Sequence, residues 1–261
     1  MSMHALPFPC LLAIALAVAP GVASAQDDAS LPETGWTGTG ELGLALARGN
    51  SRSESLNARL AFGRETDAWK HSWHAAAMRA KGESSGDFDG DGVEEDRYEL
   101  SANRYELGAS SGYKFDARNY ISGSGRYEND DFAPYEYQAT LAISYGRKVV
   151  DAEGTRLLVE AGPGYRRARD VETGAVDSEA IFRGLLDFSH RLTANTVLSN
   201  KLLVEAGSDN AFAQNDFGVA VAMNESFALK AGVQLRHNTD VGPGTRKTDT
   251  LTTINLVYSF L

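Results

Sequence analysis

Residues 135–145 read YEYQATLAISY, and this stretch decides the fold class. Tyr137, Ala139, Leu141, Ile143 and Tyr145 alternate with residues that are mostly polar. A period of two places the apolar side chains on one face of a β-strand and the polar ones on the other. The segment is longer than the ~5–6 residues of an ordinary soluble strand. It suits the ~9–11 residues that a tilted strand needs to cross a bilayer.

The same alternation recurs along the chain from Gly35 to Leu261. It is clear in five further segments, which cover residues 56–63, 179–189, 217–223, 227–236 and 253–260. It is weaker in six more, at roughly 36–48, 69–81, 103–114, 119–128, 156–166 and 197–207. Together these segments predict twelve strands.

The connections between the predicted strands alternate between short and long. The short ones are residues 65–67, 115–118, 193–195 and 224–225, and the longer polar ones are residues 82–97, 129–134, 170–177, 208–214 and 240–247. Short turns at one end and long loops at the other are typical of an outer-membrane barrel with short periplasmic turns. We therefore expect an all-β fold, an antiparallel transmembrane β-barrel of about twelve strands with longer extracellular loops. A soluble barrel or sandwich is the alternative, but the polar face carries charges in mid-strand and the apolar face has no partner sheet.

The composition alone suggests a different protein. The 261 residues carry a formal net charge of −10 and a mean hydropathy of −0.30, as in a soluble acidic protein. A membrane barrel has ordinary average hydropathy, however, because its strands are polar on alternate residues. The acidic balance argues against nonspecific nucleic-acid binding, which needs a basic surface.

The first residues predict export from the cytoplasm. Leu11 to Ala19 form an apolar run, and Val22 to Ala25 end in the small-x-small pattern that signal peptidase accepts. The expected division is a signal peptide at 1–25, a short periplasmic leader at 26–34 and the barrel at 35–261. The expected location is the bacterial outer membrane, with membrane lipid and lipopolysaccharide around a monomer.

The end of the chain also fits this location. Ile254, Leu256, Tyr258 and Phe260 are the apolar positions of the last strand. Outer-membrane barrels commonly close on such a strand, which the barrel-assembly machinery recognises. Here Leu261 follows, so the aromatic residue is penultimate. We expect this strand to contact the assembly machinery.

The sequence resembles a bacterial domain-of-unknown-function family that is described as salt-induced outer-membrane proteins. The residues that carry the resemblance are Gly49-Asn50-Ser51, Trp69, the run from Arg104-Tyr105 to Phe132, Gly162-Pro163-Gly164-Tyr165 and the closing strand to Phe260. The resemblance covers nearly the whole chain after residue 25 and rests on barrel motifs rather than a catalytic signature. It implies an outer-membrane location but no particular biochemical activity, so a narrow passive channel and a salt-response component of the envelope are both candidate functions.

The polar face of the predicted strands defines a candidate site inside the barrel. Its central members are Arg59, Arg126, Glu160, Arg183, Asp187 and Lys230. The same register adds Arg104, Arg166, Lys201, Arg236, Glu41, Glu106, Glu136 and Glu205, which gives eight cations and six anions. Such a set can line a narrow passive channel, or it can pair into salt bridges that plug the lumen. Twelve strands lie between filled and open barrels, so both interpretations remain.

One predicted loop has the start of a calcium site. Residues 87–92 read DFDGDG and place Asp87, Asp89 and Asp91 at alternate positions before a glycine. Carboxylates at this spacing open an EF-hand loop, where they bind Ca²⁺. The acidic residue of the twelfth position is missing, because Tyr98 stands there. The loop predicts either a Ca²⁺ site or an ordinary acidic surface, and we expect no other cofactor.

No motif predicts catalysis. His71 and His74 are three residues apart on a strand and therefore face opposite sides. His190 and His237 have no serine nucleophile in a recognisable setting, and no phosphate-binding loop occurs. We expect that the protein is not an enzyme, with a barrel hydrolase as the weakest alternative.

Overall fold

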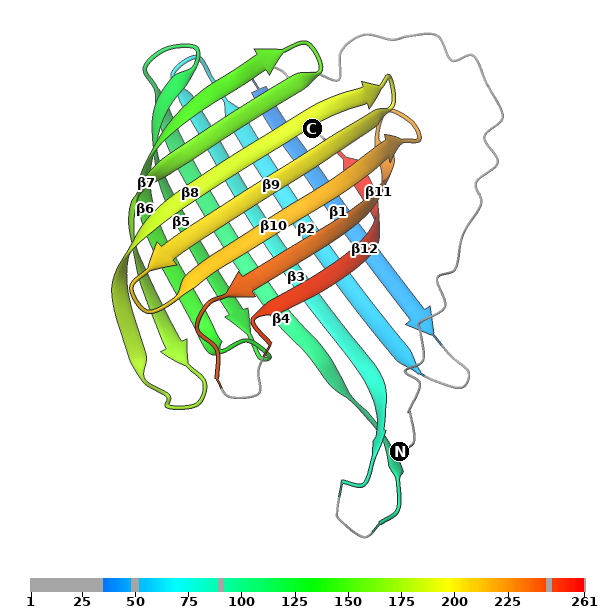
Figure 1. Cartoon of the computed structure of the whole chain (residues 1–261). Coiled ribbons are helices and arrows are strands. Elements are labelled where there is room, and N and C mark those ends of the chain that lie inside the picture. Colours follow the sequence, from blue (N-terminus) through cyan, green and yellow to red (C-terminus); the bar gives the residue numbers. More distant parts are fainter. Residues whose placement is uncertain (1–34, 48–51, 89–91, 243–245, 261) are drawn as a thin grey trace, which may run out of the picture.

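The computed structural model describes residues 35–47, 52–88, 92–242 and 246–260, and these residues form an antiparallel barrel. The strands are β1 (Gly35–Ala47), β2 (Ser53–Glu65), β3 (Trp69–Gly86), β4 (Glu95–Lys114), β5 (Asn119–Asp130), β6 (Tyr135–Ala152), β7 (Thr155–Asp170), β8 (Val176–Thr193), β9 (Thr196–Gly207), β10 (Ala211–Ala222), β11 (Phe227–Asn238) and β12 (Thr248–Ser259). Each strand pairs with its neighbours in sequence, and β12 pairs with β1 to close the ring (Figure 1). The prediction of an antiparallel barrel of twelve strands is confirmed.

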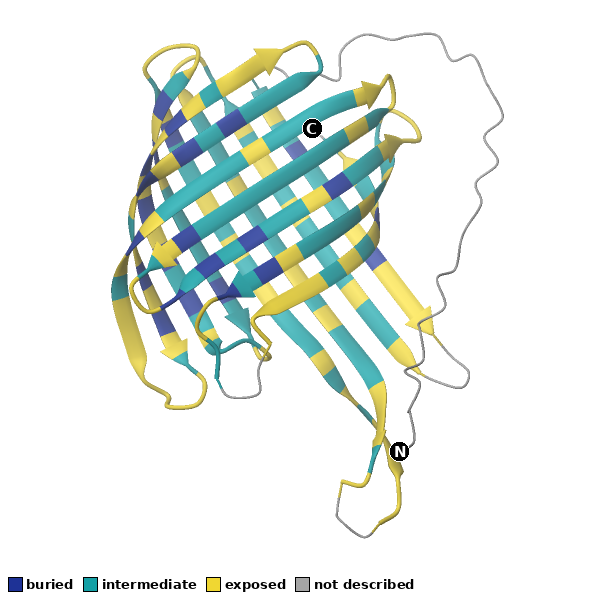
Figure 2. Ribbon diagram, in the orientation of Figure 1, coloured by how far each residue is buried: buried dark blue, intermediate teal, exposed yellow. Residues whose placement is uncertain are grey.

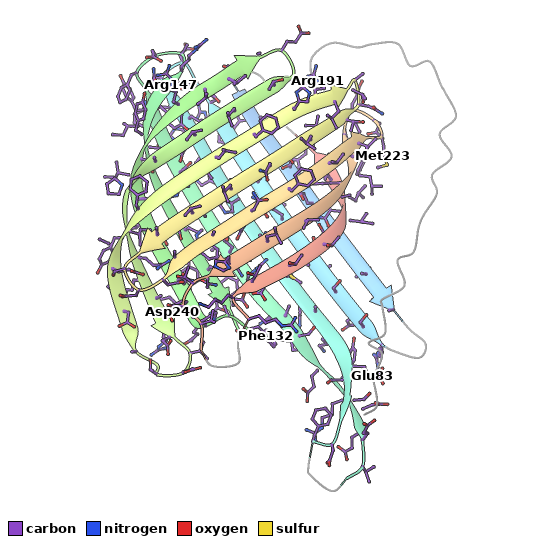
Figure 3. The ribbon with its side chains drawn as sticks, in the orientation of Figure 1. Glu83, Phe132, Arg147, Arg191, Met223 and Asp240 are labelled. Carbon is purple, nitrogen blue, oxygen red and sulfur yellow. The ribbon has the colours of Figure 1, made fainter. Side chains whose placement is uncertain are left out.

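The two ends of the barrel differ in their connections. The turns at residues 66–68, 115–118, 153–154, 194–195 and 223–226 lie at one end, here called the turn end. The start of β1 and the end of β12 also lie there, because Gly35 pairs with Glu65 and Thr39 pairs with Ser259. Figure 3 marks this end by Arg147, Arg191 and Met223, and the opposite end, the loop end, by Phe132 and Asp240.

Two of the predicted loops are wrong in extent. Half of residues 82–97 continue β3 and β4, which pair as far as Gly86 and Glu95 and project from the loop end as a hairpin (Figure 1). Residues 208–214 contain only a three-residue connection, because β9 ends at Gly207 and β10 begins at Ala211. Polar residues predict a loop only where they do not alternate with apolar ones. Both segments show a weak alternation of this kind, which is typical of a strand.

The seam that closes the barrel is its shortest ladder. β1 and β12 share four residue pairs, from Thr39–Ser259 to Leu42–Leu256. The remaining neighbouring strands each share eleven or more pairs. Closure therefore depends on the turn-end half of the seam.

The two faces of the wall have opposite chemistry. On β6 the outward side chains of Leu141, Ile143 and Tyr145 are 50–68% exposed, whereas the inward Thr140 and Ser144 are 3% and 1% exposed. Figure 2 shows this alternation of exposed and buried positions on strand after strand. A soluble barrel places its apolar side chains inside, so the distribution is the inverse of a soluble fold. The described residues contain no helix with the length and apolar character that a membrane span requires.

The turn between β4 and β5 is stabilised by one carboxylate. Asp116 accepts hydrogen bonds from the side chain of Asn119 and from the backbone N–H groups of Arg118 and Asn119. These bonds, that of the Asn119 side chain first, hold the pKa of Asp116 below its usual range. The stabilisation is present at neutral pH and is lost as the pH falls through this lowered pKa.

Gly162 sits where two strand backbones approach closely. A Cβ atom at this position would lie 2.0 Å from the carbonyl oxygen of Ile143 and 2.7 Å from the Cα of Ser144. Both neighbours are backbone atoms, which cannot move without shifting β6. In contrast, a Cβ atom at Gly123 would meet nothing within 4 Å.

We expect Gly162→Ala to destabilise the barrel by about 1–3 kcal/mol, because the added methyl group forces β6 and β7 apart. The measurement is the temperature at which the fast-migrating folded band disappears on an unboiled gel. Gly123→Ala is the matched control and should leave this temperature unchanged or slightly raised. Equal temperatures for the two variants would contradict the assignment.

Candidate functional site: the lumen

The six central members of the predicted lumen set lie on the inward register of their strands. Arg59, Arg126, Glu160, Arg183 and Asp187 all line one cavity inside the barrel. Lys230 also points inward, where its Nζ contacts both carboxylate oxygens of Glu41 at 2.8 and 3.0 Å.

Arg126 on β5 is the centre of a dense set of ion pairs. Its guanidinium contacts Glu205 on β9 at 2.6 Å, Glu128 at 2.7 Å and Glu106 at 3.6 Å. The side chain of Arg126 is 8% exposed, and those of Glu128 and Glu205 are 2% and 1% exposed. Burial of these charges is tolerable only because each has a partner of opposite sign.

A second arginine completes this set. Arg236 on β11 donates to Glu128 and contacts Asp130 at 2.9 Å. The ring of Phe212, which is fully buried, lies 4.8 Å from the guanidinium of Arg126 and 5.2 Å from that of Arg236. Both guanidinium groups can make cation–π contacts with this ring. We call Arg126, Glu128, Glu205, Phe212 and Arg236 the lumen cluster.

The lumen cluster spans the barrel from wall to wall. β5 and β11 are six steps apart in either direction around the ring of twelve strands, so they lie opposite each other. The pair of Glu128 and Arg236 therefore crosses the full lumen. Arg104 on β4 adds another crossing, since it donates to Gln234 on β11 at 2.7 Å. At this level side chains fill the interior.

The cavity on the turn side of the lumen cluster is open. It has a volume of about 890 Å³, is lined by residues of the turn end such as Glu65 and Lys148, and reaches Arg126 and Glu205 at its deep end. Within it the hydroxyl of Tyr120 donates to Glu160 at 2.7 Å, and Arg183 contacts the same carboxylate at 2.9 Å.

Three charged residues of the cavity wall differ from the lumen cluster. Arg59, Asp187 and Lys201 have no ion pair in the part of the chain that the structure describes. Asp187 is exposed although it points into the barrel. Unpaired charges of both signs need water, so this half of the lumen is suited to hold solvent and polar solutes.

One predicted lumen residue is wrong. Glu136 follows the inward register of β6, but the pairing of β6 with β7 is irregular between Tyr135 and Tyr137. The side chain of Glu136 is 51% exposed and contacts Arg169 at 3.5 Å. A local irregularity in one strand thus turns a side chain out of its expected face.

The sequence interpretation missed several partners of the cluster. Glu128 and Asp130 alternate in phase with Arg126, and this phase could have identified them. Phe212 was assigned to a loop, although it belongs to β10. Glu179 was not identified as a partner, and it binds Arg166, which also donates to the carbonyl oxygen of Asn210.

Only part of the predicted calcium loop belongs to the described residues. Asp87 accepts a hydrogen bond from the backbone N–H of Gly92 at 2.9 Å, and Gly92 has a φ of +84°. Asp89 and Asp91 lie outside the described residues. Among the residues that are described, no group of three or more His, Cys, Asp or Glu side chains could hold a metal ion. The Ca²⁺ site stays a prediction.

The histidines occupy separate places. His71 faces outward and stacks between Trp69 and Trp73, whereas His74 faces inward and contacts Glu106 at 2.8 Å. His190 and His237 contact the hydroxyl groups of Thr155 and Thr248, both at 2.8 Å. The expectation that the protein is not an enzyme stays a prediction.

The signal peptide at 1–25 and the leader at 26–34 lie outside the described residues, as do Gly49, Asn50 and Ser51. The domain division of the N-terminal part therefore stays a prediction.

We expect Arg236→Met to lower the stability of the barrel by about 3–5 kcal/mol, because it leaves Glu128 and Asp130 with a lost partner in the lumen. Urea unfolding followed by tryptophan fluorescence measures the change. Arg169→Met is the control, since its pair with Glu136 is half exposed and should contribute at most about 1 kcal/mol. Similar midpoints for the two variants would refute the structural role of the lumen cluster.

Comparisons with known proteins concern the barrel as a whole. None of the curated proteins matches the chain. Among solved structures, the chain is similar to the COG4313 outer membrane channel from Pseudomonas putida F1, with 12% identity, a TM-score of 0.49, and coverage of 90% of this chain and 100% of that one. It is similar to the NanC porin with 8% identity, a TM-score of 0.48 and coverage of 85% and 97%. It is also similar to the translocator domain of the autotransporter NalP from Neisseria meningitidis, with 12% identity, a TM-score of 0.46 and coverage of 87% of both chains. A family described as protein of unknown function, DUF481, matches residues 40–260, and the chain belongs to this family.

Proposed function

We propose that the protein is a channel of the bacterial outer membrane that the lumen cluster holds closed. The observation that carries this proposal is the ion pair between Glu128 and Arg236, which joins opposite walls of the barrel. On its turn side lies the open cavity of about 890 Å³. Only side chains, rather than a folded plug segment, close the described lumen at the level of this pair.

The outer surface supports the membrane location. Tyr105 and Tyr113 on β4, and Tyr137 and Tyr145 on β6, point outward and are each eight residues apart. Eight residues span about 26 Å of strand, or about 20 Å along the axis at the usual ~40° tilt. This is close to the ~25 Å apolar band that aromatic girdles flank in membrane barrels.

Both ends of this band carry rows of aromatic rings that lie close to one another. Near the loop end, Tyr127 lies 6.1 Å from Tyr105 on one side and 6.1 Å from Tyr137 on the other. Near the turn end, Tyr113 lies 5.3 Å from Trp69 and 6.0 Å from Phe115. Such rings favour the interface between lipid and water.

The proposal includes an orientation. The turn end faces the periplasm and the loop end faces the outside, as in other outer-membrane barrels. Lipid and lipopolysaccharide then surround a monomer, and β12 is the strand that the assembly machinery would contact.

A second function is favoured by the density of the lumen cluster. The carboxylates of Glu128 and Glu205 are almost fully buried, and both form ion pairs with Arg126. Buried and paired charges of this kind are expected in a permanent structural core. The protein would then be a structural barrel with a plugged, salt-bridged lumen and a cation-binding surface loop. A salt-response role fits either function, because both depend on charge pairs.

Planar-bilayer recordings distinguish the two functions. We expect the wild-type barrel to stay mostly closed, and the variant Glu128→Ser/Phe212→Ala/Arg236→Ser to show frequent conductance steps. This variant removes both partners of the crossing pair, so it leaves no member of that pair alone in the lumen. Lys201→Ser is the control, because it changes the cavity wall without changing the lumen cluster.

The folded state of each variant is checked by heat-modifiability on a gel. If the triple variant is folded and shows no steps, the channel is refuted and the structural barrel is supported. If Lys201→Ser opens the barrel as often as the triple variant, the lumen cluster is not the barrier.

A further inference from the structure

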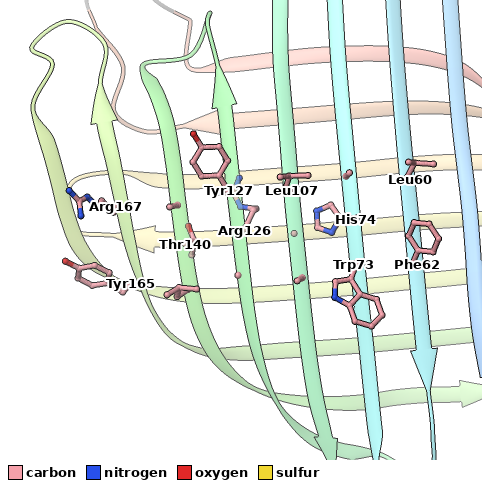
Figure 4. A pocket seen from close by; sticks show the side chains of 16 residues that line it. Leu60, Phe62, Trp73, His74, Leu107, Arg126, Tyr127, Thr140, Tyr165 and Arg167 are labelled. Carbon is pink, nitrogen blue, oxygen red and sulfur yellow. The ribbon is translucent and has the colours of Figure 1, made fainter.

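The outer face of the wall carries a groove, although four of its lining residues, His74, Gly108, Arg126 and Thr140, have the inward register. It has a volume of about 810 Å³, and Figure 4 shows it from close by. Its outward-facing lining comes from six neighbouring strands, β2 to β7, with two residues from each strand.

The groove follows from the pairing of the strands. Two adjacent cross-strand rows form it, one from Leu60 to Arg167 and the other from Phe62 to Tyr165. In these rows the small residues Ala75, Ala109, Gly125 and Ala139 occupy consecutive strands, β3 to β6. Ala75 and Ala139 belong to the first row and Ala109 and Gly125 to the second, so these small side chains lie next to one another on the wall. Small side chains beside large ones leave a trench in the wall.

Different residues line the sides and one end of the trench. Phe62 and Trp73 lie toward β2 and β3, Leu107 and Tyr127 lie in the middle, and Tyr165 and Arg167 lie at the β7 end (Figure 4). Five steps between strands cover about 24 Å at ~4.8 Å each. The trench is therefore long, narrow and apolar along its floor.

Arg167 is the charged group of this groove. It points outward, is exposed, and lies three residues before the loop end of β7. It has no ion pair in the described part of the chain, whereas its neighbour Arg169 contacts Glu136. An unpaired guanidinium at the edge of an apolar trench needs an anionic partner, and phosphate matches its donors well.

We propose that this groove binds one acyl chain of a phosphorylated glycolipid of the lipid A type, whose phosphate contacts Arg167. The proposal rests on the membrane location and orientation given above, which place Arg167 in the outer leaflet. The floor accepts the chain because Ala109 and Gly125 leave room for it. The charge complementarity of Arg167 selects an anionic headgroup over a neutral or zwitterionic one.

Native mass spectrometry of the detergent-purified barrel tests this site, with bisphosphorylated lipid A as the probe. The wild type should retain one lipid A. Ala109→Phe fills the trench, and Arg167→Gln removes the charge. Each should weaken binding about tenfold, which corresponds to ~1.4 kcal/mol.

Matched controls lie elsewhere on the outer face. Ala231→Phe adds the same ring on β11, and Arg79→Gln removes an outward arginine of β3. Neither should change lipid A binding. Dephosphorylated lipid A and phosphatidylethanolamine should bind the wild type as weakly as lipid A binds Arg167→Gln.

The proposal is overturned if Ala109→Phe and Ala231→Phe bind equally, or if the dephosphorylated lipid binds as well as lipid A. It is also overturned if the wild type forms dimers that Ala109→Phe abolishes, because a second copy would then occupy the groove. Both groove variants should keep the wild-type conductance. A failure at the groove is thus distinguishable from a failure of the closed channel, which lies inside the barrel.

Discussion

The closed ring of backbone hydrogen bonds is the constraint on which the rest of the molecule depends. Once β12 pairs with β1, each strand has neighbours on both sides, and every side chain in the wall must point either in or out. Alternate residues then meet two environments. The outward set can be apolar without a partner sheet, and the inward set must satisfy its charges within the lumen.

The inward charges are accommodated in two different ways along the length of the lumen. At the level of Arg126 and Arg236 the charges pair across the barrel and around Phe212, and their side chains are buried. Toward the turn end, Arg59, Asp187 and Lys201 remain without ion pairs in the described chain and line an open cavity. One interior thus combines a barrier of paired side chains with an open cavity, and this combination is what the proposed closed channel requires.

The outer face of the barrel wall also has a specific arrangement of side chains. The four small residues from Ala75 to Ala139 end beside Arg167, an outward arginine with no ion pair in the described part of the chain. The aromatic rings of Tyr105, Tyr127 and Tyr137 lie near the loop end of the barrel, as does this arginine. The apolar trench, the aromatic rings and the cation thus lie together on one part of the outer wall.

The sequence by itself determined the strand class, the number of strands and the inward face of each, because the period of two is a local property of residues such as Leu141 and Ile143. It could not determine the ends of strands such as β10, since polar residues occur both in loops and on inward faces. It also could not predict the irregularity of β6 that turns Glu136 outward. The tertiary structure alone decided which charges meet. Glu128 and Arg236 are 108 residues apart and face each other only because the ring closes with β5 opposite β11, and the groove exists only because the strand register aligns four small residues.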